Sequence, residues 1–583
     1  MKERITLILI VKDEEKKLPK CLQSVQGHVD EIIIVDTGST DNTVEIASRF
    51  TDKIYRYPWE GDFSAARNFA LAQASGEWIL SLDADEELVS GEGDLQRLIN
   101  TGQNVEAYLL SLHYPTADSS GAYNIFHVLR LFRNNGRYFF QGKIHEQVVV
   151  QERGVVGVAD RPSIRHKLLS TKERNRKRER NLALLKKACS REPDNLFLQY
   201  YLGVEWLMLG KPQKALPYLK QSYEQLTDEH LLFRAPALRY LIMCLQALGR
   251  LEEAICLCLE ADIKYPDYTD IYYLGGVLFE EKKEYQLAVK WLKQAVLCGS
   301  PPALYSHLHG TESFLAYYHL GYCTEMLGQK EEAKENYEKA LQANPHYVYP
   351  LYNLFMLFCT AHGPKATLAY LREKGLLADA QMAKEAANLF FISGYANLAY
   401  SCLADFKASA EVARELKLDL AKYAVLSGRA RQGLELLNTV SEDKVLRAEA
   451  SIYCLLAHLL LGEFTQARTL ALALWKQSDS RCLGHAFLCL IQVLDKGTMP
   501  ICPLKIREED VLEQLIKIFD LCSYYLPERS SEADSFYFKL KSGLEALCTN
   551  ISAEGCLSLA ECYGQRAGNW RSFCANKFGL KGK

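Results

Sequence analysis

The stretch Trp78–Glu86 reads WILSLDADE: five mostly apolar residues, then three acidic residues within four positions. In an extended backbone, residues i and i+2 point to the same side, so Asp83 and Asp85 can present two carboxylates to one point. Carboxylate oxygens at the end of a strand suit Mg²⁺ or Mn²⁺, which keep open positions for phosphate oxygens. A solvated acidic loop after a strand would show the same pattern. The neighbouring motifs are therefore needed to distinguish a metal site from such a loop.

Two further predicted strands also end in polar residues. Ile5–Val11 is followed by Lys-Asp-Glu-Glu, and Glu31–Val35 is followed by Asp-Thr-Gly-Ser. Asp36 offers a hydrogen-bond acceptor, as the ring N–H of a uracil would require. Gly38 permits a tight turn beside a ligand because it has no side chain to clash. Parallel sheets bind ligands at the carboxyl ends of their strands, so a ligand site is expected there.

Arg67 lies in a predicted helix, Phe63–Ala74, between the third and fourth predicted strands. Its guanidinium has forked donors that match a diphosphate. An ion pair with Asp62 or Glu60 would use the same donors, and the sequence leaves both interpretations open.

In this order, the motifs resemble those of family 2 nucleotide-sugar glycosyltransferases with the GT-A fold. The shared pattern is a first strand ending near Asn/Asp-Glu, a second ending in V-D-x-x-S-x-D, an A-R-N helix and a D-x-D. The resemblance covers roughly residues 4–90 and extends more weakly to about 168. It implies a metal ion, Mn²⁺ or Mg²⁺, held by Asp83 and Asp85. It also implies nucleotide-sugar contacts from Val11, Asp13, Glu14, Asp36, Gly38, Ser39, Arg67, Asp83 and Ala84. Asp13 departs from the family, in which this position is more often Asn, and Asp lacks the donor that Asn has.

A second region is expected to supply the catalytic base. Gln141–Gln147, preceded by Arg-Leu-Phe-Arg at 130–133, is similar to a signature of those family members that carry helical repeats. The resemblance implies Glu146 as the base and His145 as a metal or diphosphate contact. Neighbours in a strand face opposite ways, so both serve only if the strand ends there. His166 stands where such enzymes place a third metal ligand. Structural roles are the alternative for all three residues.

Short β-rich runs alternate with helical stretches over residues 1–90, which indicates βαβ units and a parallel sheet. Runs between 100 and 168 predict further strands of the same domain, partly in antiparallel pairs. The predicted strands are Ile5–Val11, Glu31–Val35, Lys53–Tyr57, Glu77–Leu82, Tyr108–His113, Phe126–Phe132, Val148–Val150 and Ser163–His166.

From about residue 175 a repeat replaces the strands. Small residues recur in one register at Ala215, Ala254, Ala288, Ala333, Ala399, Gly433 and Ala467. A glycine stands five residues before each of them, except that Lys283 precedes Ala288. A small residue where two helices touch and a glycine at the turn resemble the tetratricopeptide repeat (TPR). Stacked pairs of this kind form a solenoid that binds a segment of another protein, with a mere spacer as the alternative.

The expected fold class is therefore α/β plus all-α: a GT-A domain with a Rossmann-like mixed sheet, followed by an α-solenoid of TPR-like repeats. The expected domains are 1–170 (GT-A), 171–195 (linker helix), 196–490 (repeats) and 491–583 (C-terminal helical cap).

The charge and hydropathy of the chain argue against some classes of function. The formal net charge of −3 supplies no basic field for nucleic acid. The one basic cluster, Lys172–Arg180, is interleaved with glutamates and predicts a solvated helix face. No apolar run approaches the ~18 residues of a membrane helix, and the first residues lack a signal-peptide cleavage pattern. We expect a cytoplasmic protein without an integral membrane segment.

Together with the repeats, the resemblance implies a metal-dependent, inverting transfer of glucose or N-acetylglucosamine from a UDP-sugar to Ser/Thr, or Cys, of a protein or peptide held by the repeats. Flagellin is the expected acceptor from the resemblance. Two alternatives stay open: a TPR scaffold whose transferase domain has decayed, and a transferase for surface-glycan or lipid-linked acceptors.

Overall fold

The computed structural model describes residues 3–525 except 102–103, 117–120, 152–153, 228–230, 407–413, 441–445 and 497–507. The chain divides into two compact units, Met1–Leu354 and Phe355–Lys583. The fold class is the one expected: an α/β part with a mixed sheet, then a long run of helices. The domain limits at 170, 195 and 490 stay predictions, and most of the expected C-terminal cap lies outside the described residues.

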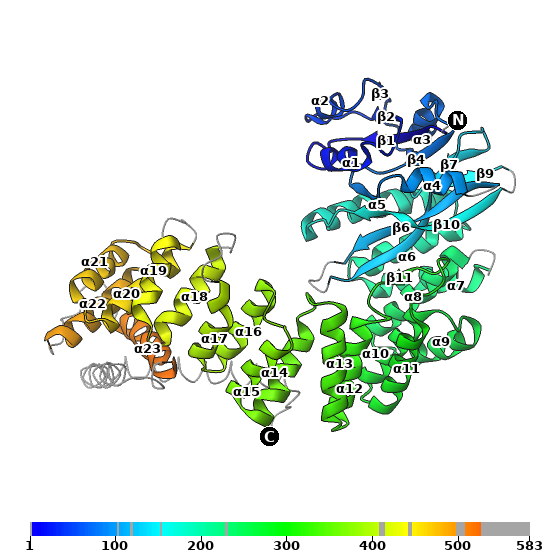
Figure 1. Ribbon diagram of the computed structural model, residues 1–583. Coiled ribbons are helices and arrows are strands. Elements are labelled where there is room, and N and C mark those ends of the chain that lie inside the picture. The colour runs from blue at the N-terminus through cyan, green and yellow to red at the C-terminus, as the bar shows by residue number, and fades with distance from the viewer. Residues whose placement is uncertain are drawn as a thin grey trace. The chain divides into compact units, whose positions relative to one another are not determined.

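The first unit begins with a mixed sheet, which in the described residues has nine strands in the order β3-β2-β1-β4-β7-β6-β10-β5, with β11 paired to β7 (Figure 1). β1 is parallel to β2 and β4, and β7 is antiparallel to β4 and β6. The strands are β1 (Ile5–Val11), β2 (Glu31–Asp36), β3 (Ile54–Arg56), β4 (Trp78–Ser81), β5 (Glu86–Val89), β6 (Val105–Pro115), β7 (Tyr123–Arg133), β10 (Val155–His166) and β11 (His307–Leu308). A separate hairpin joins β8 (Tyr138–Gln141) to β9 (Gln147–Val150).

The central strands are apolar along their whole length because both faces of the sheet are covered. β1 reads ITLILIV and is buried throughout except at Ile10. Its two faces contribute to two separate hydrophobic clusters, one containing Leu7 and Leu9, the other Ile8. The helices of this part are α1 (Leu18–Val25), α2 (Thr43–Ala47), α3 (Phe63–Gln73) and α4 (Asp94–Thr101).

The predicted strands all coincide with observed ones, but three observed strands were not predicted. β5 begins with Glu86 and Glu87, so its start reads as an acidic loop. β8 stands close after an Asn-Asn-Gly turn, and β11 is two residues long, too short for any periodicity.

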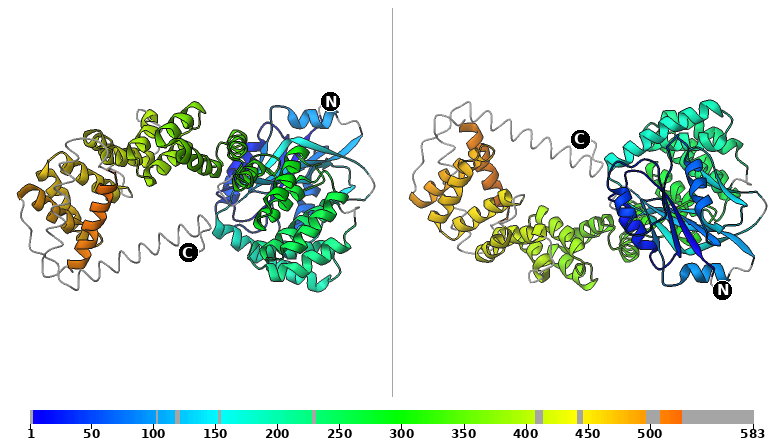
Figure 2. Two further views of the ribbon diagram at one scale, coloured as in Figure 1. Left: turned by 90° about the horizontal axis from the view of Figure 1, so that it is seen from below. Right: turned by 90° about the horizontal axis from the view of Figure 1, so that it is seen from above.

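After the sheet the chain is helical. The remaining helices of the first unit are α5 (Thr171–Arg191), α6 (Leu196–Met208), α7 (Pro212–Gln225), α8 (Leu231–Ala247), α9 (Leu251–Lys264), α10 (Thr269–Glu281), α11 (Tyr285–Cys298), α12 (Phe314–Met326) and α13 (Lys330–Ala343). The boundary between the two units falls within α14 (Tyr349–His362). The helices of the second unit are α15 (Pro364–Glu373), α16 (Ala380–Ile392), α17 (Ala396–Leu403), α18 (Arg414–Leu426), α19 (Ala430–Val440), α20 (Arg447–Leu460), α21 (Phe464–Trp475), α22 (Arg481–Lys496) and α23 (Glu508–Tyr525), with a 3-10 turn η2 (Ala404–Phe406). Figure 2 shows the green helices of the first unit packed together beside its strands.

The packing of the helix pairs explains the repeat register. Ala215, Ala288 and Ala333 are completely buried where two helices of a pair touch. The contact is close enough that a Cβ added at Gly276 would lie 2.5 Å from Leu292, and one added at Gly321 would lie 2.5 Å from Tyr337. Only a residue without a side chain permits these approaches.

The residue five positions before the small one ends the first helix in the left-handed conformation. Gly249 has φ 70° and Gly328 has φ 79°. Lys283, at the same register position, adopts φ 63°, a conformation that costs an L-residue free energy. The turn geometry, rather than the glycine itself, is therefore the repeated feature.

The gap in the register between Ala288 and Ala333 contains an insertion with a structural role. Its strand β11 pairs antiparallel with β7, His307 opposite Ile125 and Leu308 opposite Asn124. The helical part of the first unit thus extends the sheet. Within the described ranges, no helix is long and apolar enough to cross a membrane.

Candidate active site

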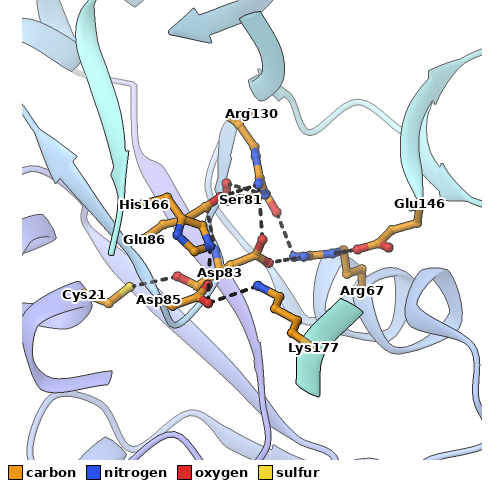
Figure 3. A network of polar contacts seen from close by, with 10 residues as sticks. All are labelled: Cys21, Arg67, Ser81, Asp83, Asp85, Glu86, Arg130, Glu146, His166 and Lys177. Atoms are coloured by element: carbon orange, nitrogen blue, oxygen red, sulfur yellow. Dashed lines mark hydrogen bonds and ion pairs between the residues drawn. The ribbon is translucent and has the colours of Figure 1, made fainter. Parts of the chain in front are cut away.

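The ends of β1, β2 and β4 meet at one edge of the sheet because the three strands are parallel and in register. Val11 lies opposite Asp36, and Ile8 lies opposite Ser81, two residues before Asp83. Figure 3 shows the polar side chains that gather there, contributed by α1, α3, β4, the β4–β5 loop, β5, β7, β10, α5 and the β8–β9 loop.

Asp83 is held by the buried Arg67 and the partly buried Arg130. Its Oδ1 pairs with Arg67 Nη2, and its Oδ2 lies 3.3 Å from Arg130 Nη2. Burial by itself would raise the pKa of Asp83, but the charges of Arg67 and Arg130 outweigh it and hold that pKa well below its usual range. Arg67 also donates from Nε to Glu146 Oε1 at 2.6 Å and from Nη1 to Ser81 Oγ at 3.2 Å. Arg67 therefore links the acidic strand end to Glu146.

The ion pairs of Arg67 differ from those that the sequence suggested. Asp62 caps α3 instead, accepting from the Ala65 N–H at 3.1 Å. The partners Asp83 and Glu146 lie on distant parts of the chain, so no local spacing indicates them.

Asp85 faces a different set of groups. Its Oδ2 lies 3.3 Å from His166 Nε2 and 3.2 Å from Lys177 Nζ. Because His166 Nδ1 lies 2.8 Å from the Lys167 carbonyl oxygen, which can only accept, Nδ1 carries a proton. In a neutral ring, Nε2 then presents a lone pair to the carboxylate. Such a pair of electron-pair donors needs a cation beside it, which Lys177 supplies in the structure, whereas a doubly protonated ring would donate to the carboxylate directly.

Glu86 is the third acid of the strand end and is buried. Its Oε1 accepts from Arg130 Nη2 at 2.7 Å, and its Oε2 accepts from the Asp83 N–H at 2.8 Å. Burial raises the pKa of Glu86 to about 7, with the Asp83 charge adding to the rise and Arg130 opposing it. The Cys21 thiol donates to the Asp83 carbonyl at 3.5 Å, and burial raises its pKa well above the usual value.

The residues that are expected to bind the nucleotide also form hydrogen bonds that shape the loops after β1 and β2. Asp36 accepts from the N–H groups of Gly38 at 3.3 Å and Ser39 at 3.0 Å. Gly38 has φ 106°, which favours glycine. The Asp13 N–H donates to Ser39 Oγ at 3.0 Å, and Asp13 Oδ1 accepts from the Thr40 N–H at 2.8 Å. Asp13 therefore accepts a hydrogen bond that an Asn side chain could also accept. Having Asp in place of the family's usual Asn is thus compatible with this loop conformation.

Three other predicted residues complete this edge. Val11 is buried, and its carbonyl accepts from the Thr37 N–H at 3.0 Å. Glu14 donates through its N–H to Thr43 Oγ1 at 2.7 Å, and burial raises the pKa of its carboxyl group. Ala84 is buried between the two aspartates.

His145 lies in the β8–β9 loop with φ 52°, so the strand does end before it. Its ring stacks on Tyr201 of α6, with 3.9 Å between ring centroids and 2° between ring planes. Its Nε2 is buried with no hydrogen-bond partner among the described residues. Burial, with Lys177 and Arg180 adding to it, lowers the pKa of His145 to about 4, so the ring is neutral at pH 7. A neutral imidazole can ligate a metal or donate a hydrogen bond, but it has no positive charge to pair with a diphosphate.

The structure thus joins Arg67, Asp83 and Glu146 through ion pairs and brings Asp85 and His166 together in an adjacent group. Sequence reasoning assigned no role to Glu86, Arg130 or Lys177. Glu86 belongs to the stretch Trp78–Glu86, and Arg130 belongs to the Arg-Leu-Phe-Arg motif at 130–133.

The expectation for the basic cluster 172–180 was wrong in part. Lys177 and Arg178 point inward, to Asp85 and to Glu205 of α6, because acids buried on two other elements draw them there. The charge of the acidic strand end was the signal that could have revealed the first of these pairs.

Residues 6–182 match the family model described as glycosyl transferase family 2, and residues 315–347 match a tetratricopeptide repeat model. Residues 6–182 are a family 2 glycosyltransferase domain. The resemblance inferred from the motifs is confirmed for this domain and for the repeats.

Two relatives illustrate the similarity. The chain is 31% identical to the SPbeta prophage-derived glycosyltransferase SunS of Bacillus subtilis over 286 residues, 47% of this chain and 66% of the relative. It is 35% identical to a TPR repeat-containing protein of Synechococcus elongatus over 248 residues, 41% of this chain and 59% of the relative. In both cases the chain spans less than two thirds of the relative's own length.

Among solved structures, the crystal structure of MamA matches with 20% sequence identity and a TM-score of 0.25, covering 30% of this chain and 95% of that chain. The TPR protein YrrB matches with 14% identity and a TM-score of 0.25, covering 31% of this chain and 85% of that chain.

Proposed function

We propose that this chain transfers a sugar from a UDP-sugar to a serine, threonine or cysteine side chain of a protein or peptide. The observation that carries the proposal is the network in which Arg67 joins Asp83 to Glu146 at the edge where β1, β2 and β4 end. This edge of a parallel sheet is where such folds bind nucleotides. The family 2 domain and the similarity to glycosyltransferase SunS support sugar transfer.

The residues at Asp85 fit a divalent ion. His166 Nε2 lies 3.3 Å from Asp85 Oδ2, and a neutral imidazole nitrogen with a carboxylate oxygen suits Mn²⁺, or Mg²⁺ with more water. No group of three or more His, Cys, Asp or Glu converges among the described residues, so phosphate oxygens and water would fill the other positions. Asp83 is directed to the arginines, which makes Asp85 and His166 the proposed protein ligands. The ion would neutralise charge on the departing nucleoside diphosphate.

The proposed base is Glu146. Its Oε1 accepts from Arg67 Nε, which leaves Oε2 to take the proton of the acceptor hydroxyl or thiol. Arg67 orients the carboxylate, and removal of that proton permits direct attack on the anomeric carbon with inversion. Asp36 and the Gly38–Ser39 turn would hold the base and ribose of UDP. His145 is proposed to contact the reacting groups through its unpartnered Nε2.

The proposed acceptor is a protein because TPR arrays bind segments of other proteins. Flagellin is the acceptor that we would test first, and glucose and N-acetylglucosamine are the sugars.

The test measures UDP release and sugar transfer from a panel of UDP-sugars with Mn²⁺, using flagellin and peptide acceptors. We expect Asp85→Ala to lower turnover about 10²–10³-fold through loss of charge stabilisation. Glu146→Gln keeps an oxygen for Arg67 and should lower transfer about 10²–10⁴-fold while UDP binding stays unchanged.

A wild-type protein that neither binds UDP with Mn²⁺ nor turns over any UDP-sugar would favour the scaffold instead. Transfer to lipid-linked or glycan acceptors alone would overturn the choice of a protein acceptor.

A further inference from the structure

The basic helix α5 places one ammonium group inside the acidic site. Its N-terminus is fixed by a capping box between Ser170 and Glu173. One turn beyond, Lys177 Nζ lies 3.2 Å from Asp85 Oδ2, and next to it Arg178 Nη1 lies 3.0 Å from Glu205 Oε2 of α6. Because the helix is anchored at both places, Lys177 is presented to Asp85 by the fold and does not reach it by chance.

Lys177 is the permanent cation that Asp85 contacts among the described residues. Arg67 is engaged by Asp83 and Glu146, and Arg130 is engaged by Glu86 and Asp83. His166 approaches the same Oδ2 atom as Lys177, at 3.3 Å. The ammonium therefore contacts the same carboxylate oxygen that lies 3.3 Å from His166 Nε2 and that would ligate a divalent ion (Figure 3).

A divalent ion on Asp85 and His166 would stand a few ångströms from this ammonium. Repulsion between charges this close is strong in a partly buried site. The site holds four carboxyl groups against the three cations Arg67, Arg130 and Lys177, so a divalent ion would change its formal charge from −1 to +1. A diphosphate supplies the missing negative charge and offers the ammonium a new partner.

We propose that Lys177 excludes divalent ions from Asp85 in the free protein and moves to the diphosphate when a nucleotide binds. The side chain can make this change because it is a flexible four-carbon stem, 38% exposed in the structure. Metal and nucleotide then enter together, and the protein does not hold the ion between turnovers. This inference rests on the proposed function, since it takes Asp85 and His166 as metal ligands.

The experiment titrates Mn²⁺ into the full-length protein without nucleotide and follows free Mn²⁺ by electron paramagnetic resonance. We expect Lys177→Met to bind Mn²⁺ about tenfold or more tightly than the wild type, because the competing charge is gone. Lys177→Arg keeps the charge and should bind as weakly as the wild type. Lys172→Met removes an exposed charge from the same helix and is the matched control. Equal or weaker Mn²⁺ binding by Lys177→Met overturns the exclusion.

A second arm measures UDP binding by calorimetry at saturating Mn²⁺. Here Lys177→Met should bind UDP about tenfold more weakly, because a charge-assisted contact to the diphosphate is missing. Unchanged UDP affinity overturns the movement to the diphosphate. A thermal unfolding curve shows that each variant is folded, and Lys177→Gln replaces the methionine variant if that one is not.

The two proposals fail in different ways. If the wild type binds no UDP at any Mn²⁺ concentration, the proposed function is wrong and this inference falls with it. If the wild type binds UDP with Mn²⁺ while Lys177→Met behaves like the wild type in both arms, this inference alone is wrong.

Discussion

At the scale of single residues, the Asp-Ala-Asp motif divides its work between two sets of partners. Asp83 faces Arg67 and Arg130, whereas Asp85 faces His166 and Lys177. An extended backbone would direct both carboxylates to one side, but β4 ends at Ser81 and the pair lies in a turn that the Glu86 N–H closes on the Asp83 carbonyl oxygen at 3.0 Å. The expectation of one shared point was therefore wrong. The motif therefore combines one carboxylate that organises arginines with one that is suited to an ion.

Arg130 and Glu86 provide a test of this arrangement. Arg130→Gln removes the cation beside the buried Glu86 carboxyl, whose pKa burial already raises to about 7, so the carboxyl takes up a proton and we expect a loss of roughly 1–3 kcal/mol in the free energy of unfolding. Glu86→Gln in the same protein should restore part of that loss, because the unpaired carboxyl is gone. Urea unfolding of both single variants and the double variant measures the coupling. Strictly additive losses would show that the two side chains do not stabilise each other.

At the scale of elements, the turn inside each helix pair depends on one left-handed residue. The register that predicts glycine there is observed at Gly249 and Gly328, and Lys283 is the departure from it. The Lys283 side chain is exposed, so its backbone conformation is the main consequence of having lysine at this position.

We expect Lys283→Gly to raise the free energy of unfolding by about 0.5–1 kcal/mol, because glycine adopts positive φ without steric cost. Gly249→Ala is the matched reverse change, since a Cβ there meets no atom within 4 Å and only the backbone preference alters. That variant should lose about 1 kcal/mol or slightly more. Chemical denaturation of both variants checks the pair, and a destabilised Lys283→Gly would contradict the argument.

Much of the fold was predictable because its signals are local. The strands β1, β2 and β4 are continuous apolar runs, and the helix pairs repeat a small residue and a glycine at fixed spacing. The positions of Asp36, Asp83 and Asp85 at one edge followed from parallel strands alone. β11 and the inward direction of Lys177 did not, because each depends on a partner far away in the chain. The base, the metal ligands and the nucleotide contacts remain predictions from resemblance and geometry.

At the scale of the first unit as a whole, a buried charge cluster connects the sheet to the helices. Arg239 of α8 contacts Asn124 of β7 and lies 3.1 Å from Asp270 of α10. His307 of β11 lies 2.7 Å from Asp270 and 3.0 Å from Glu312. Burial by itself would lower the pKa of His307, but hydrogen bonds to Asp270 and Glu312 outweigh it and raise that pKa to about 9.

This cluster predicts how stability depends on pH. A raised pKa means that the contribution of His307 is complete below its ordinary pKa of about 6.5 and is lost as the pH rises through about 9. We expect the wild type to be more stable than His307→Gln by up to roughly 3 kcal/mol at pH 6, and this difference to shrink by pH 10. Unfolding of the two proteins across that range tests the prediction. A difference that stays constant with pH would show that His307 is not the titrating group.

The pairing of β11 with β7 also has a consequence for biosynthesis. A ribosome synthesises β7 and its neighbours long before His307 and Leu308. While the first helix pairs are being synthesised, Asn124 and Ile125 therefore lack the strand that pairs with them in the folded protein. An unmatched edge invites pairing with other chains. Nascent chains that stall before codon 307 should therefore be the ones that chaperones engage, and those that pass it should escape.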